Sequence, residues 1–125
     1  MSDAEYRAAI ACGPLLPPVL DRLLGALAAR ADLSVDRLND LSLVGDAVSS
    51  VAAESVAANS RLLVTATPRS GGLELSFGPF LAGGAARVRR AGRLPGGGDL
   101  FSSVANQVDV EADGTAERLT LHIGR

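Results

Sequence analysis

One long amphipathic pattern, over residues 35–54, constrains this chain more than any other feature. Apolar residues recur there at steps of three and four, which predicts a helix with one buried stripe. The stripe consists of Leu38, Leu41, Val44, Val48, Val51 and Ser55. The opposite, polar face carries Asn39, Ser42, Asp46, Ser49 and Ser50. Ser34 is a suitable N-cap, and we expect the rest of the chain to support this helix and to cover its polar face.

Composition is that of an ordinary globular domain. A length of 125 residues fits one domain, over 1–125, with a hydrophobic core of its own, and 47% of the residues are apolar. The formal net charge of −2 argues against nucleic acid as a direct partner. We find no signal peptide and no apolar run of membrane-spanning length, so we expect a cytoplasmic protein without membrane contact.

The residue types present exclude several kinds of site. All 12 basic residues are arginine, which excludes a lysine base, a Schiff base and a P-loop lysine. Cys12 is the single cysteine, so there is no internal disulfide and no cysteine and histidine set for zinc. We expect Cys12 to behave as a small hydrophobic residue. We expect His122 to be a surface residue, because no cysteine or acid precedes or follows it at a spacing typical of a ligand set.

Shorter patterns predict the remaining elements. Alternating apolar residues predict strands over 6–12, 61–67, 73–77, 108–112 and 117–123, and helical spacing predicts helices over 17–31 and 100–106. The turn signals at 68–72 and Asp113-Gly114 predict two hairpins. The glycine-rich interval 78–98 has no sustained period, which predicts a long loop that is either functional or disordered.

These elements together predict the fold class. Each predicted strand has a single apolar face, which excludes a sheet covered on both sides. We expect an α/β (α+β) two-layer sandwich, with a mixed, mainly antiparallel sheet of about five strands and helices on one face.

The order of the elements resembles the GHKL ATP-binding fold of histidine kinases and gyrases. Within that fold the chain is most similar to the small anti-sigma-factor serine kinases of bacterial partner-switching systems. The resemblance spans residues 6–123 and rests on element order and on two stretches, LPPVLDRLLGALAARADLSVDRLNDLSLVGDAVSSV and GGGDLFSSVANQVDVEADGTAERLTLHIG. It implies a nucleotide site for ATP and magnesium, with 78–98 as a lid-like loop.

The second long helix of that family carries a glutamate and, four residues later, an asparagine. The acid is the candidate general base, and the asparagine helps to hold magnesium on the triphosphate. Asp46 and Ser50 stand at these positions, so Asp46 is the candidate base and Ser50 the candidate magnesium ligand. Asp is one methylene shorter than Glu, and Ser is a weaker ligand than Asn. The alternative is a solvated polar helix face.

Two further family motifs are altered. The family reads adenine with the Asp of an Asp-x-Gly-x-Gly motif, but Gly78 stands at the Asp position and Phe80 at that of the first Gly. Glycine has no side chain that could accept that hydrogen bond. Phosphate is held by a Gly-x-Gly-Leu motif, which Gly96, Gly97 and Gly98 approximate. Their backbone amides could bind an anion, which the following Asp99 would repel; a simple hinge is the alternative.

Four arginines accompany these glycines, and Arg87 and Arg90 are the candidate nucleotide ligands among them. The full set is Arg87, Arg89, Arg90 and Arg93. Guanidinium groups suit phosphate, so the four could form an anion clamp in a nucleotide lid. They could equally dock an acidic partner or keep a flexible loop solvated.

The altered motifs favour loss of the chemistry. We expect a non-catalytic regulatory module without a bound cofactor, which would bind a sigma factor or an antagonist-type protein. ATP and magnesium would bind only if the altered site still works. An active ATP-dependent serine kinase and a dimerisation or scaffold domain are the alternatives. The resemblance also implies a homodimer.

Overall fold

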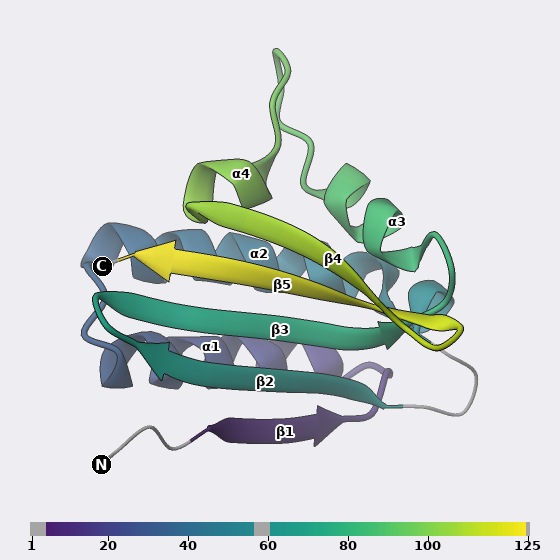
Figure 1. Cartoon of the computed structure of the whole chain (residues 1–125), viewed down its shortest axis with the longest axis horizontal. Helices are drawn as coiled ribbons and strands as arrows, with labels where there is room; N and C mark the ends of the chain where they lie inside the picture. Colours follow the sequence, from purple (N-terminus) through teal and green to yellow (C-terminus); the bar gives the residue numbers. More distant parts are fainter. Residues whose placement is uncertain (1–4, 57–60, 125) are drawn as a thin grey trace.

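The structure is a computed structural model, which describes residues 5–56 and 61–124. A five-stranded antiparallel sheet has the order β1-β2-β3-β5-β4, and the helices lie on one of its faces (Figure 1). The strands are β1 (Tyr6–Ile10), β2 (Leu62–Arg69), β3 (Gly72–Phe80), β4 (Gln107–Asp113) and β5 (Ala116–Gly124). The helices are α1 (Leu16–Arg30), α2 (Val35–Ser55), α3 (Gly84–Ala91) and α4 (Leu100–Val104). The predicted two-layer sandwich is therefore confirmed.

Helix α2 forms where the apolar stripe predicts it, with Ser34 as its N-cap. The Ser34 hydroxyl accepts the backbone N–H of Arg37 at 3.2 Å. Leu41, Val44 and Val48 are fully buried against the sheet and α1. The assignment of Leu38 to the buried stripe was wrong, because Leu38 lies at the outer side of the α1–α2 contact, over Gly25, and is 40% exposed.

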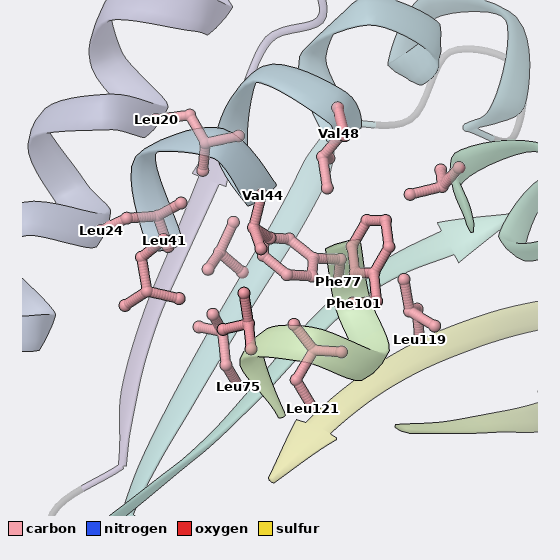
Figure 2. Close-up of a cluster of buried hydrophobic side chains, with 14 of the residues drawn as sticks. Leu20, Leu24, Leu41, Val44, Val48, Leu75, Phe77, Phe101, Leu119 and Leu121 are labelled. Atoms are coloured by element: carbon pink, nitrogen blue, oxygen red, sulfur yellow. The ribbon is translucent and has the colours of Figure 1, made fainter. Parts of the chain in front are cut away.

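Helix α1 packs closely against α2 because Gly45 has no side chain. A Cβ at this position would come within 3.0 Å of the Leu24 side chain. The two helices share one core with the inward side chains of the sheet and with Phe101 of α4, as Figure 2 shows. Leu75 faces Leu121 across the β3–β5 ladder within this core.

The other face of the sheet carries mostly polar side chains, as expected of an antiparallel sheet that is covered on one side only. Gly114, at φ +66°, makes the turn between β4 and β5, where the Asp113-Gly114 signal predicted it. Among the described residues, no helix is both long enough and apolar enough to cross a membrane.

The expectation that 78–98 lacks regular structure was wrong. Strand β3 continues to Phe80, and the eight residues of α3 follow. The α3 pattern is too short to be read as periodic, with only Ala85 and Val88 as its buried apolar side chains. Tertiary contacts hold it instead, including a hydrogen bond of 3.2 Å from the Ala85 N–H to the Glu117 carboxylate.

Candidate functional site

Asp46 and Ser50 line a hollow of about 290 Å³ between α2 and the segment that joins α3 to α4. Ala47 and Gly92 are buried residues of its lining, and Arg93, which follows Gly92, also lines it. The structure thus brings the two candidate residues of α2 next to the end of the arginine-rich segment, although these regions are about forty residues apart.

The hollow is more apolar than a phosphate site would be. Leu43 and Leu94 are the exposed large apolar side chains of its lining, at 51% and 38%. The Ser50 hydroxyl donates to the Ala47 carbonyl at 2.8 Å, which occupies its only donor. Asp46 is exposed and has no hydrogen-bond or ion-pair partner in the described part of the chain. The site therefore offers one carboxylate, one hydroxyl oxygen and the Arg93 guanidinium.

The structure does not place Gly78 at this hollow. Gly78 pairs with Leu63 in the β2–β3 ladder and lines a different hollow of about 140 Å³, on the open face of the sheet. A Cβ on Gly78 would come within 3.0 Å of the Glu117 carbonyl oxygen, so glycine suits the close approach of β5. Phe80 is fully buried. Gly78, which stands where the resembled family has its adenine-binding Asp, thus lines a hollow on the open face of the sheet, whereas Asp46 lies on α2, on the other face.

The three consecutive glycines form the tip of a projecting loop (Figure 1). The Leu94 N–H donates to the Gly98 carbonyl at 3.1 Å, and the Gly97 N–H donates to the Leu94 carbonyl at 3.2 Å. Gly96, Gly97 and Gly98 are exposed, with φ angles of +85°, +105° and +77°. The tip therefore closes on itself, and its glycines do not line the hollow beside Asp46.

Asp99 anchors this loop to α4 and to α3. Its carboxylate accepts the Ser102 backbone N–H at 3.2 Å as the N-cap of α4 and lies 2.7 Å from Arg89 Nη2. Burial alone would raise the pKa of Asp99, but the hydrogen bonds from Arg89 and Ser102 outweigh it, and the pKa lies below its ordinary value. Asp99 is therefore a paired structural carboxylate.

The four arginines of the segment 87–93 make different contacts. Arg87 lies 3.7 Å from Glu54 at the end of α2, whereas Arg89 binds Asp99. Arg90 is exposed, and of the four only Arg93 lines the hollow. Arg87 and Arg90 lie three residues apart on α3, and neither lines the hollow beside Asp46.

A polar cluster on the open face of the sheet was missed from the sequence. His122 Nε2 lies 3.1 Å from Asp109 Oδ2, and His122 Nδ1 lies 3.6 Å from Glu74 Oε1. The three residues come from adjacent strands, and strand register brings them together. Placing the outward residues of the predicted strands in register is the signal that could have found this cluster.

Among the described residues, no group of three or more histidine, cysteine, aspartate or glutamate side chains could hold a metal ion. Cys12 is a free, half-buried thiol that packs against the core. Comparison with protein-family models and with curated protein sequences finds no match to this chain.

Proposed function

We propose that this chain is a non-catalytic regulatory module that binds a sigma factor or an antagonist-type protein, in a bacterial partner-switching system in the cytoplasm. The proposal starts from the resemblance of the sequence to anti-sigma-factor serine kinases. It is supported by one structural observation, which is the dispersal of the residues that would have to act together on a nucleotide.

A kinase site needs a group that recognises adenine, a metal ligand and a phosphate-binding loop, and all three must contact the same molecule of ATP. Here Asp46 and Ser50 line one hollow, Gly78 lines another on the opposite face of the sheet, and Gly96, Gly97 and Gly98 line neither. Arg89, which could have bound phosphate, is held by Asp99. Phosphoryl transfer has little support from this arrangement.

The first test is a thermal-shift titration with Mg-ATP at millimolar concentration. A ligand present at 100 times its Kd adds about 2.7 kcal/mol to the free energy of unfolding, which would raise the Tm by several degrees. We expect no shift beyond that caused by magnesium chloride alone. A shift of several degrees that is lost in Asp46→Ala, with Ala53→Ser on the same helix as the control, would contradict the proposal.

The second test measures binding by isothermal titration calorimetry, using the sigma factors and antagonist-type proteins of the source genome. We expect one of them to bind without nucleotide and without acquiring phosphate. Binding by none of them would contradict the proposed function.

The alternative of a divergent kinase keeps one supporting observation, namely that Asp46, Ser50 and Arg93 share the same hollow. It predicts transfer of radiolabel from ATP to the bound partner and loss of that transfer in Asp46→Ala. A scaffold or homodimer predicts self-association in analytical ultracentrifugation with no partner bound.

A further inference from the structure

We propose that the outer edge of β4 binds an extended, basic segment of a partner protein, which joins the sheet as an additional strand. The inference rests on the proposed function only in taking the chain to be a protein-binding module. It adds the surface at which the partner would bind and the pattern of the segment, in which apolar residues alternate with lysine or arginine.

The first observation is a regular sheet edge with an unpaired outer side. Strand β4 pairs with β5 on one side and with no other described strand (Figure 1). Its seven residues pair with β5 without a bulge and include neither proline nor glycine. Among the described residues, no backbone hydrogen bond from a turn or loop reaches 107–113. The outward N–H and C=O groups of such an edge can pair with another strand.

The second observation is that the two faces of this edge differ. Successive side chains of a strand point to opposite faces of the sheet. Val110 stands opposite the buried Leu119 in the ladder, on the face that the helices cover, yet it is 49% exposed. Asp109 and Glu111 point to the open face. An added strand follows the same alternation, so its apolar side chains would cover Val110 and the intervening ones would lie beside Asp109 and Glu111.

The third observation is the charge of the open face at this edge. The Glu111 carboxylate accepts the neutral Thr120 hydroxyl at 3.1 Å. In the described part of the chain Glu111 makes no ion pair, although Arg118 stands opposite it in the ladder. Asp109 Oδ2 lies 3.1 Å from His122 Nε2. Lysine or arginine on the incoming strand would therefore meet carboxylates on its own face, and opposite charges on neighbouring strands stabilise their pairing.

The same charges decide between possible occupants. Antiparallel pairing of β4 with β4 of a second copy would set Asp109 and Glu111 against the same carboxylates, and like charges on facing strands are destabilising. At the opposite edge of the sheet, the only charged residue of β1 is Arg7, which pairs with Glu5. A basic segment would therefore be attracted at β4 rather than at β1, whereas a second copy or an acidic segment would be repelled at β4.

The test uses the full chain and a fluorescein-labelled heptapeptide that alternates valine with lysine. We expect saturable binding by fluorescence anisotropy, together with slower amide hydrogen exchange within residues 107–113. Two matched peptides separate the contributions of charge and backbone. Replacing the lysines by glutamates should abolish the binding. Methylating every backbone nitrogen keeps the charge but removes the donors of the added strand, and should also abolish the binding.

Variants of the chain locate the binding surface. Glu111→Lys should weaken binding roughly tenfold, because it places a like charge beside the lysines of the peptide. Glu5→Lys makes the same change in net charge beside the opposite edge strand, so it is the matched control and should bind like the wild type. Both glutamates are exposed, so neither change should disturb the fold, which circular dichroism checks.

Absence of binding, binding without protection of 107–113, or equal binding of the N-methylated peptide would overturn the proposal. So would binding that Glu111→Lys does not weaken, or that Glu5→Lys weakens equally, because the attraction would then depend on net charge alone. Failure of the proposed function is read separately. A sigma factor that binds wild type and Glu111→Lys equally leaves that function intact and removes this edge from it. Peptide binding at β4 without any such partner gives the opposite result.

Discussion

Helix α2 and the α3–α4 segment cover the same face of the sheet but are held by different means. Helix α2 is 21 residues long and buries Leu41, Val44 and Val48 among the side chains of the sheet (Figure 2). The α3–α4 segment consists of two short helices and a glycine tip. It is held by close approaches at Gly84 and Gly92 and by the contacts of Asp99.

The difference explains why one region was predicted correctly and the other was not. Apolar packing over many turns leaves a repeating pattern in the sequence. Where two backbone segments approach closely, the only sign in the sequence is a glycine, and a glycine is equally typical of a flexible loop. Substitutions in each region measure whether the two also differ in how much they contribute to stability.

Removing a large side chain from the shared core should have the largest effect. Phe77 is fully buried between the sheet and the helices, and Phe77→Ala should cost about 3–5 kcal/mol of unfolding free energy because it leaves a cavity. Chemical denaturation measures the change. A cost below about 1 kcal/mol would mean that the core beneath α2 is not the main source of stability.

Adding one methyl group at Gly92 should destabilise the α3–α4 segment. A Cβ there would come within 2.7 Å of the Phe101 ring, so Gly92→Ala should cost about 1–3 kcal/mol through overpacking. Gly25→Ala in α1 is the matched control, because its nearest neighbour would be 3.8 Å away. Gly25→Ala should stabilise the helix by up to about 1 kcal/mol. Equal effects at the two sites, measured by denaturation, would refute the close-approach account.

Cutting the link between the two regions should have a smaller effect. Arg37 of α2 donates to the Val104 carbonyl at 3.0 Å and to the Ser103 carbonyl at 3.4 Å, at the end of α4. Arg37→Ala should cost about 1 kcal/mol and speed amide exchange in α4 more than in α2. Exposed Arg22 serves as the control, and Arg22→Ala should change stability by less than about 0.5 kcal/mol. Uniform exchange in both helices would mean that they open as one unit.

The charge of Asp99 should have the smallest effect, with a defined pH dependence. Asp99→Asn keeps an N-cap side chain but removes the ion pair with Arg89, which is partly exposed, so we expect a loss of up to about 1 kcal/mol at pH 7. The folded-state pKa lies below that of the unfolded chain. The carboxylate therefore stabilises the fold above about pH 4, and this contribution is lost as the pH falls through the lowered pKa. A variant difference that stays constant from pH 7 to pH 2.5 would exclude this assignment.

Much of the fold could be read from the sequence, and less of the candidate site. The hairpin of β4 and β5 formed as predicted because Gly114 supplies the positive φ that its turn requires. Asp46 and Ser50 were correctly placed on one helix face because they are four residues apart. The separation of Asp46 and Ser50 from Gly78 and from the glycine tip could not be predicted. The local sequence pattern does not show on which face of the sheet a residue far away in the chain will lie.

By itself, the sequence determined the apolar faces of the long helices and of the strands, and therefore the two-layer architecture. Buried positions repeat with the period of the helix or strand, so the spacing of the apolar residues shows which face of each element is buried. Only the tertiary structure decided that α3 forms and that His122 contacts Glu74 and Asp109. It also decided that the candidate nucleotide residues lie apart from one another. These depend on strand register and on distances between backbones, which are set by packing between segments far apart in the chain.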